Sequence, residues 1–349
     1  MLRAVHEASE RAGRFFDIYK VGGDADDPLI ENGDINHLRK SADAVDALSG
    51  TSCVVGGTAW VFSREELESK FDYLFIDEAG QFSLANVVGT GLSANNIVLV
   101  GDQMQLSQPS QGTHPGESGQ SALDYLLDGK ATIPPEFGIF LEQTWRMHPK
   151  ICGFISKAIY EDRLISHPGT KKQRIHLSDS DSVIVSRDAG IVFVPVEHEG
   201  NSQRSEEEAD VIERIVSELV GKTVSTFDGE EQKSLTLEDI LLVAPFNMQV
   251  RLLQDRLGEQ ARVGSVDKFQ GQEAHAVIIS MCSSTLEDSP RGAEFLLDPN
   301  RINVAVSRAR SLAIVVGSPE IMRARCKTIK EMKLLNLYCW LVDYAGREV

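Results

Sequence analysis

The stretch LFIDEAG at residues 74–80 decides the fold, because an apolar run ends there in two adjacent carboxylates, Asp77 and Glu78. Ligands of parallel α/β sheets bind in the crevice at the carboxyl ends of the strands. Phosphoryl transfer needs a hard oxygen ligand for Mg²⁺ and a group that positions the attacking water. One carboxylate for each task suits ATP hydrolysis. An Asp-Glu pair is also common in exposed turns, so the interpretation needs further motifs.

Similar short apolar runs recur along the chain, and several are apolar throughout rather than alternating. They lie at 53–55, 73–76, 97–100, 139–141, 191–196, 240–246, 276–281 and 312–317. Strands buried on both faces have this pattern, which indicates parallel sheets covered by helices. Helical patterns lie between the runs, and in the clearest one Ser205 and Glu208 predict a capping box before an apolar face over 211–219. The predicted fold class is therefore α/β.

Composition sets limits on the function. The 349 residues leave room for two domains, and 42% hydrophobic with 25% charged residues is typical of a globular protein. No run of eighteen apolar residues exists and the first residues lack the layout of a signal peptide, so we expect a cytoplasmic protein without a membrane partner. Five widely spaced cysteines without a C-x-x-C pair disfavour a structural zinc site, an iron–sulfur cluster or a disulfide framework.

The net charge of −17, from 35 basic and 52 acidic residues, by itself counts against a nucleic-acid binder. A motor that grips a strand in one groove can nevertheless be acidic elsewhere. Composition therefore does not decide whether the chain binds nucleic acid, and the sequence motifs are needed for that decision.

A second motif, VGDQMQL at 100–106, also follows an apolar run directly. Gly101 permits a tight turn, and the amides that follow it, from Asp102 on, can reach a phosphate. A glutamine in this place can sense the γ-phosphate or hold the attacking water. Standing alone, the motif would be explained as an ordinary strand-to-loop turn.

Two further motifs, QTWRMHP at 143–149 and NVAVSRAR at 303–310, each offer an arginine near a strand end. The transition state of phosphoryl transfer spreads negative charge over the γ-phosphoryl oxygens, and a planar, permanently charged guanidinium suits it. Two such arginines from a second domain facing the first would couple hydrolysis to domain closure. The alternative for either arginine is a surface ion pair.

The remaining motifs suit contacts with a nucleic-acid strand. In VGSVDKFQGQE at 263–273, the serine and the lysine can contact phosphates, and the final glutamate can accept from a ribose hydroxyl or orient an arginine. VAPFNMQ at 243–249 and GGTA at 56–59 can present backbone and polar side chains to a strand. For these last two, a strand end followed by a helix start is the stronger alternative.

The order of the motifs is more specific than any one of them. D-E-A-G, G-D-Q-x-Q-L, Q-x-W-R-M-H-P, V-D-K-F-Q-G-Q-E and N-V-A-V-S-R-A-R follow one another between residues 77 and 310. This series resembles superfamily 1 helicases, and most of all the branch of the nonsense-mediated-decay helicase, whose second half is often called the AAA-type helicase C-terminal domain. The resemblance implies two RecA-like domains, at 1–143 and 144–349, and an ATP-driven 5′-to-3′ motor on single-stranded DNA or RNA.

The resemblance also implies roles for single residues. Asp77 would ligate Mg²⁺, Glu78 would be the catalytic base, Gln105 would contact the γ-phosphate, and Arg146 and Arg308 would be arginine fingers. Further ATP contacts would come from Gly101, Asp102, Gly271 and Glu273, with Glu273 beside the ribose. Nucleic-acid contacts would come from Thr58, Pro245, Ser265 and Lys268. Trp145 stands where relatives often carry tyrosine, and Gly80 is a tolerated variant at its position.

The family's first motif, the P-loop G-x-x-x-x-G-K-[ST], has no match in these residues. The pair GK at 129–130 is followed by Ala131, and for GKT at 221–223 the glycine required five residues before Gly221 is Val216. Gly221 is instead predicted to cap the preceding helix. Because the P-loop cradles the ATP phosphates, we expect little or no hydrolysis by this chain alone. We also expect exposed apolar edges in a first sheet that lacks its phosphate-binding strand.

Three interpretations stay open at this level. The first is a motor fragment whose P-loop, with or without a nuclease domain, lies upstream of Met1. The second is a helicase relative that holds nucleic acid or a partner without hydrolysis, against which the intact carboxylates and arginines count. The third is a split enzyme completed by a separate P-loop polypeptide.

Overall fold

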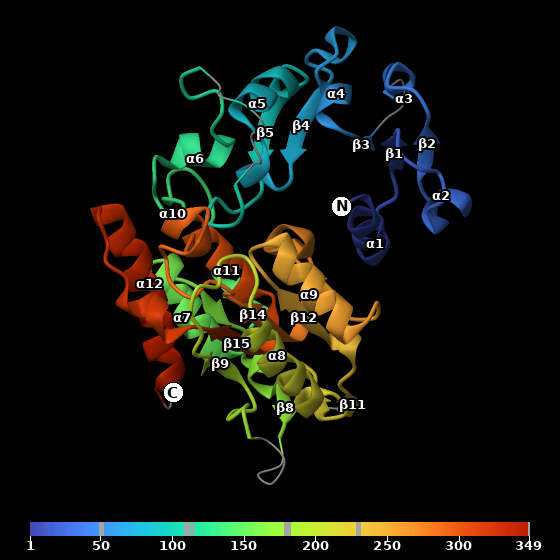
Figure 1. Ribbon diagram of the computed structural model, residues 1–349. Helices are drawn as coiled ribbons and strands as arrows, with labels where there is room; N and C mark the ends of the chain where they lie inside the picture. The colour runs from blue at the N-terminus through green and yellow to red at the C-terminus, as the bar shows by residue number, and fades with distance from the viewer. Residues whose placement is uncertain (49–51, 108–111, 113–114, 178–182, 228–231, 348–349) are drawn as a thin grey trace. The chain divides into compact units, whose positions relative to one another are not determined.

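The computed structural model describes residues 1–48, 52–107, 112, 115–177, 183–227 and 232–347. Backbone contacts divide the chain into two compact units (Figure 1), and we describe each by itself. Unit 1 comprises Met1–Gln103 and Ser107–Gly129, and unit 2 comprises Met104–Leu106 and Lys130–Val349. Both units combine parallel strands with helices, which confirms the predicted α/β class. The domain boundary at residue 143 stays a prediction.

Unit 1 contains two separate parallel sheets. The first has the strand order β2-β1-β3, and the second is the pair β4-β5. The elements are α1 (Leu2–Ala12), β1 (Asp17–Val21), α2 (Pro28–Glu31), β2 (Asn36–Leu38), α3 (Asp43–Ala47), β3 (Cys53–Gly56), α4 (Ala59–Phe62), η1 (Glu65–Leu67), β4 (Phe71–Ile76), η2 (Ala79–Gln81), α5 (Leu84–Gly91), β5 (Ala94–Leu99) and α6 (Ala122–Leu127). The predicted strands at 53–55, 73–76 and 97–100 are thus present, with bounds within three residues of those expected.

The pair β4-β5 exposes much of its apolar surface. Tyr73 and Phe75, which share one face of β4, are 59% and 60% exposed, and Ile97 on β5 is exposed as well. Only Leu74 and Ile76, on the other face of β4, are buried. A two-stranded sheet has too little surface of its own to bury such side chains. The exposed apolar surface is a face of the sheet, and the exposed apolar edges expected from the sequence stay a prediction.

Unit 2 is built on a five-stranded, fully parallel sheet with the order β13-β12-β14-β15-β9. Its elements are β6 (Gln143–Thr144), α7 (Pro149–Ile159), β7 (Ile165–Ser166), η3 (Pro168–Lys172), β8 (Arg174–His176), β9 (Gly190–Pro195), α8 (Glu206–Leu219), β10 (Thr223–Ser225), β11 (Gln232–Ser234), η4 (Leu237–Asp239), β12 (Ile240–Val243), α9 (Asn247–Leu257), β13 (Arg262–Gly264), η5 (Val266–Phe269), β14 (Ala274–Ser280), α10 (Gly292–Leu296), α11 (Pro299–Ser307), β15 (Ala309–Gly317), η6 (Pro319–Arg323) and α12 (Ile329–Gly346).

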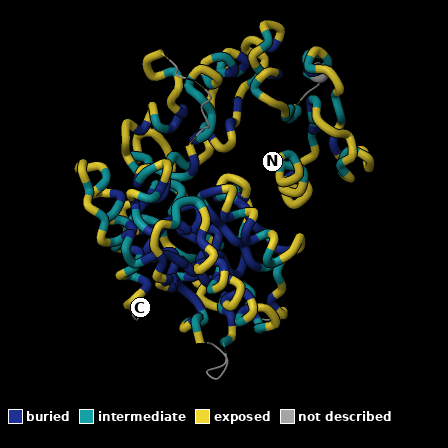
Figure 2. The backbone as a smooth tube through the Cα atoms, viewed as in Figure 1, coloured by how far each residue is buried: buried dark blue, intermediate teal, exposed yellow. Residues whose placement is uncertain are grey.

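The unit 2 sheet is buried on both faces, as its uninterrupted apolar strands predict. Alternate residues of β12, β14 and β15 enter two core clusters: α7, α11 and α12 cover one face, and α8 and α9 cover the other. Every residue of β14 is buried, and Figure 2 shows this sheet as the largest dark region of the unit. The carboxyl edge of the sheet is therefore carried by a rigid core.

A predicted strand and a predicted capping box differ from the structure. Residues 139–141 form no strand, and Ile139 and Leu141 are 86% and 77% exposed, because among the described residues no neighbouring strand pairs with them. The segment pairs only further on, where Gln143 and Thr144 meet β7. The predicted capping box forms by half: Ser205 accepts from the Glu208 amide at 3.1 Å, but the Glu208 side chain turns into the core instead of back to Ser205.

A helix ends just before the GKT tripeptide, as predicted, but Gly221 is not its cap. The capping residue of α8 is Val220, and the Gly221 amide donates to the Leu235 carbonyl at 2.8 Å. Gly221 has a φ of +85°, which glycine adopts without strain, and the tripeptide leads from the helix end into β10.

Candidate functional site

Unit 2 brings together one carboxylate and two arginines from distant parts of the chain. Arg146 Nε, just after β6, donates to Glu273 Oε2 at 2.7 Å. Arg310 on β15 donates to Glu273 Oε1, on the other side of the same carboxylate. Two guanidinium groups and one carboxylate leave a net charge of +1. This cluster can attract an anion.

The arginines control the ionisation of the carboxylate. Burial is the largest single effect and raises the pKa of Glu273, but the hydrogen bonds and charges of Arg310 and Arg146 outweigh it and hold the pKa below its usual value. Glu273 is therefore ionised at neutral pH and fixes the orientation of both arginines. Arg146 Nη1 also donates to the Ser307 carbonyl at 3.4 Å.

Arg308 is next to this cluster and binds the glutamine of the second motif. Its Nη2 donates to Gln105 Oε1 at 3.1 Å and its Nη1 to the Gln272 carbonyl at 3.4 Å. Arg308 is only 3% exposed, whereas the Arg146 side chain is one-third exposed. The structure thus places Gln105, Arg146, Glu273 and Arg308 around one pair of backbone segments, 272–273 and 307–308.

Sequence reasoning missed Arg310. It assigned arginines only to the two motif positions, yet Arg310 holds the second oxygen of Glu273. The available signal was its place two residues after Arg308 at the start of an apolar run, where alternate residues of a strand share a face.

Trp145, which is exposed, belongs to an aromatic stack beside Arg146. Its ring lies 3.8 Å from that of His167, nearly parallel, and 5.7 Å from that of Phe227. Gly169 makes this packing possible, since a Cβ at that position would come within 2.6 Å of the Phe227 ring. The stack therefore holds the exposed Trp145 ring next to Arg146.

The carboxylate pair lies at the end of β4 in unit 1. Both side chains are exposed, and Asp77 Oδ1 accepts from the Glu78 amide at 3.1 Å. Glu78 has a φ of +54°, uncommon for a residue other than glycine and frequent at functional sites. An exposed carboxylate at a strand end can hold Mg²⁺, which typically takes one or two protein carboxylates plus water and phosphate oxygens. Such a site does not require a cluster of protein ligands. Among the described residues, no cluster of three or more His, Cys, Asp or Glu side chains could hold a metal ion.

Two glycines explain how the DEAG and GDQ motifs pack together. A Cβ on Gly80 would come within 2.5 Å of the Asp102 carbonyl oxygen, and one on Gly101 within 2.6 Å of the Ala79 amide nitrogen. The backbones therefore touch, and neither position has room for a side chain. This corrects the reason predicted for Gly101, which does not have the left-handed φ of a tight turn.

The predicted nucleic-acid contacts divide between the units. Thr58 is an exposed residue before α4 in unit 1. Pro245 and Ser265 follow β12 and β13 at the carboxyl edge of the unit 2 sheet. Lys268 lies one turn after Ser265, and its ammonium donates to the Val263 carbonyl at 2.9 Å. The loop then turns at Gly271, whose φ is +74°.

A comparison with models of protein families shows the family to which the chain belongs. Residues 119–320, more than half of the chain, match the family model described as an AAA domain. The chain belongs to this family, in the superfamily 1 helicase branch that includes the nonsense-mediated-decay helicase. Enzymes of this kind are ATP-dependent helicases. None of the described helices is long and apolar enough to cross a bilayer.

Curated relatives carry related names. The chain is 27% identical over 87% of its length to the DNA replication ATP-dependent helicase/nuclease JHS1 of Arabidopsis thaliana, of which it spans 23%. It is 28% identical over 81% of its length to the DNA polymerase alpha-associated DNA helicase A of Schizosaccharomyces pombe, of which it spans 42%. It is 29% identical over 78% of its length to the ATP-dependent helicase upf1 of the same yeast, of which it spans 28%. The chain thus corresponds to less than half of each relative.

Among solved structures, the arterivirus nonstructural protein 10 helicase aligns with a TM-score of 0.43 at 16% identity. The alignment covers 90% of this chain and 49% of that one.

Proposed function

We propose that this chain is part of an ATP-driven motor that moves along single-stranded DNA or RNA in the 5′-to-3′ direction. The observation that carries the proposal is the Glu273 cluster, in which one ionised carboxylate orients Arg146 and Arg310 and leaves a net positive charge. A γ-phosphoryl group in transfer is the kind of anion that such a cluster stabilises.

The proposal gives each unit its own part of the chemistry. In unit 1, Asp77 holds Mg²⁺ and Glu78 takes the proton of the attacking water, while the amides at Gly101 and Asp102 face phosphate oxygens. In unit 2, Gln105 contacts the γ-phosphate, and Arg146 and Arg308 balance its negative charge. Gly271 lets the loop turn so that Glu273 lies beside the ribose. Mg²⁺, when bound, neutralises charge on the phosphates.

A strand is proposed to follow the carboxyl edge of the unit 2 sheet. Pro245, Ser265 and Lys268 lie there after β12 and β13, and ligands of parallel sheets bind at this edge. Thr58 of unit 1 is proposed to add a further backbone contact.

The absence of a P-loop from these 349 residues bears on whether the chain can hydrolyse ATP by itself. We infer that the chain alone binds a strand but turns over little ATP. If a separate polypeptide supplies the phosphate cradle, a small P-loop protein should copurify with the chain and restore hydrolysis. A purified chain that is stable and monomeric would count against that split enzyme.

The proposed strand path can be tested by fluorescence anisotropy with labelled 20-nucleotide oligothymidylate and oligouridylate. We expect affinity to fall steeply with salt, because phosphate contacts release counterions. Lys268→Ala should weaken the binding of both oligonucleotides. It should also reduce the magnitude of the slope of the logarithm of the binding constant against the logarithm of the salt concentration by about one.

Lys157→Ala, at an exposed lysine of α7 outside the proposed path, is the matched control and should leave the slope unchanged. Equal slopes for Lys268→Ala and Lys157→Ala would remove Lys268 from the strand path.

A further inference from the structure

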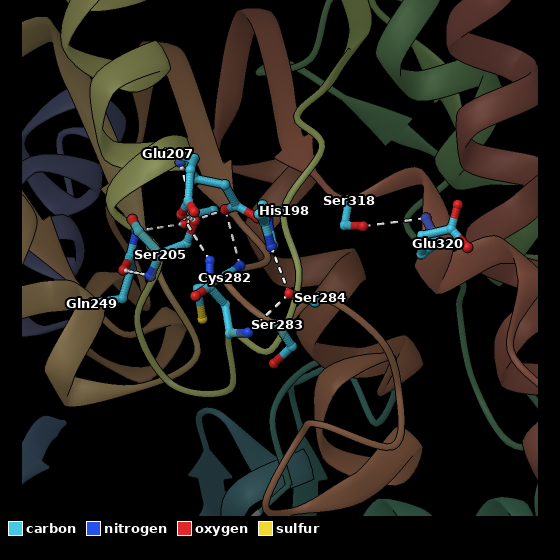
Figure 3. A network of polar contacts seen from close by, with 12 residues as sticks. His198, Ser205, Glu207, Gln249, Cys282, Ser283, Ser284, Ser318 and Glu320 are labelled. Atoms are coloured by element: carbon cyan, nitrogen blue, oxygen red, sulfur yellow. Dashed lines mark hydrogen bonds and ion pairs between the residues drawn. The ribbon is translucent and has the colours of Figure 1, made fainter.

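A buried polar network connects three elements near the carboxyl edge of the unit 2 sheet (Figure 3). We call it the Glu208 network, and its members are His198, Ser205, Glu208, Gln249, Ser280, Cys282 and Ser284. All seven residues are buried. They come from the segment after β9, the cap and first turn of α8, the first turn of α9, the end of β14 and the residues just after it.

Glu208 is the centre of the network. Its Oε2 accepts from the Ser280 hydroxyl at 2.6 Å and from the Cys282 amide at 2.9 Å, and its Oε1 is 3.0 Å from His198 Nε2. A buried carboxylate is tolerated only when it is well hydrogen-bonded. The three partners meet that requirement and fix the end of β14 against the start of α8.

The arrangement of Ser284, His198 and Glu208 resembles that of a hydrolase triad, since the Ser284 hydroxyl is 2.8 Å from His198 Nδ1. Ser284 is buried, however, and its oxygen also accepts from the Asn201 amide at 2.9 Å. A substrate therefore has no access to this hydroxyl. The three residues position backbone segments and are not nucleophilic machinery.

Gln249 extends the network to α9. Its Oε1 accepts from the Ser205 amide at 2.8 Å, and its Nε2 donates to the Ser205 carbonyl and to the Ser280 hydroxyl, both at 3.1 Å. Gln249 is the third residue of α9, and the capping residue Phe246 supplies no side-chain hydrogen bond. The start of α9 is therefore fixed by Gln249 and not by a local cap.

The start of α9 is also where a strand contact is proposed. Pro245 directly precedes Phe246, the capping residue of the helix, and Asn247 and Met248 of the first turn are exposed. We propose that Gln249 is a positioning residue for strand binding: it touches no nucleic acid, but it holds segment 245–248 in place through Ser205 and Ser280. This inference rests on the proposed function, which places Pro245 on the strand path.

Gln249→Leu removes all three amide hydrogen bonds at similar side-chain size. Gln254→Leu is the matched control, because Gln254 lies on the same helix and its amide donates elsewhere, to the Gly258 and Ala261 carbonyls. With labelled oligothymidylate as the probe, we expect Gln249→Leu to weaken binding by about tenfold, the effect of losing one or two hydrogen bonds. The control should stay within about twofold of the unaltered chain.

The active fraction separates positioning from simple unfolding. Titration with excess oligothymidylate should show an unchanged number of binding sites per Gln249→Leu chain, a weaker Kd and an unchanged salt slope, because segment 245–248 carries no cationic side chain. Fewer sites at an unchanged Kd would overturn the inference, because the substitution would then only unfold part of the sample. Equal Kd values for both variants would overturn it as well. If the unaltered chain binds no strand even at low salt, the proposed function itself fails.

Discussion

The two parallel sheets that carry the predicted nucleotide residues differ in how well they are covered. In unit 2, β14 is buried along its whole length, and helices cover both faces of the sheet. In unit 1, β4 and β5 form a two-stranded sheet whose aromatic side chains Tyr73 and Phe75 are mostly exposed. The arginines thus extend from a complete core, whereas the carboxylates extend from an uncovered strand pair.

This difference shows which of the predicted nucleotide residues the described chain itself holds in place. Glu273 holds two arginines through its own hydrogen bonds, inside a unit that has its own hydrophobic core. Asp77 and Glu78 are exposed, and Asp77 accepts a hydrogen bond from the Glu78 amide in their turn. The arginines of unit 2 are therefore held in place more firmly than the carboxylates of unit 1.

The largest expected contrast comes from deleting one aromatic ring in each unit. Phe154→Ala removes a fully buried ring that packs against Trp340 and Tyr344, and it should cost about 3–5 kcal/mol of unfolding free energy. Phe75→Ala removes a ring that is mostly exposed, and it should cost less than about 1 kcal/mol. Urea unfolding followed by circular dichroism measures both, and comparable losses would mean that β4 is covered in solution.

The next largest effect is the pH dependence of the unfolding free energy of unit 2, to which His148 contributes. Burial, followed by the charges of Arg174 and Lys150, lowers the pKa of His148 from 6.5 to about 4. The unfolded imidazole takes up a proton below pH 6.5 while the folded one does not, so unit 2 should lose stability as pH falls from 6.5 towards 4. The loss is at most about 3 kcal/mol, since one unit of pKa corresponds to about 1.4 kcal/mol.

His148→Asn is the control for this pH effect, because an asparagine can still accept from the Lys150 amide as a helix cap. Its unfolding free energy, measured at pH 7 and pH 4.5, should fall by less than that of the unaltered chain. Parallel pH profiles would show that His148 does not carry the effect.

The smallest expected effects come from two glycines of unit 1. Gly80→Ala puts a Cβ against the Asp102 carbonyl oxygen and should cost about 1–3 kcal/mol. Gly89→Ala, inside α5 with its nearest neighbour at 4.0 Å, should stabilise by about 0.5–1 kcal/mol, because alanine favours the helix. Effects of the same sign in thermal unfolding would show that the DEAG and GDQ backbones do not touch in solution.

The sequence predicted most of the strands because buried parallel strands are apolar without interruption, as β12, β14 and β15 are. It failed at 139–141, since an apolar run becomes a strand only where another strand pairs with it, and no local pattern shows that partner. Glu208 was interpreted as a capping residue because serine three residues earlier suggested it. Its burial against β14, 72 residues away, is a tertiary contact that spacing cannot show.

The candidate site was also predicted only in part, because motifs show local chemistry and not tertiary contacts. The motif order identified Gln105, Arg146, Glu273 and Arg308, and the structure brings them to adjacent backbone segments. Arg310 and Gln249 were not assigned roles, because their importance comes from the partners they hold and not from the chemistry of a motif. Roles that depend on a bound nucleotide or strand stay predictions for experiment.

The most direct test is an ATP hydrolysis assay of the purified chain with saturating oligothymidylate and with oligouridylate. Our account predicts strand binding with little or no turnover, because the chain carries the carboxylates, Gln105 and the arginines but no P-loop to hold the phosphates. Robust strand-stimulated turnover that Glu78→Gln abolishes would contradict it, and would mean that residues described here hold the triphosphate without a P-loop.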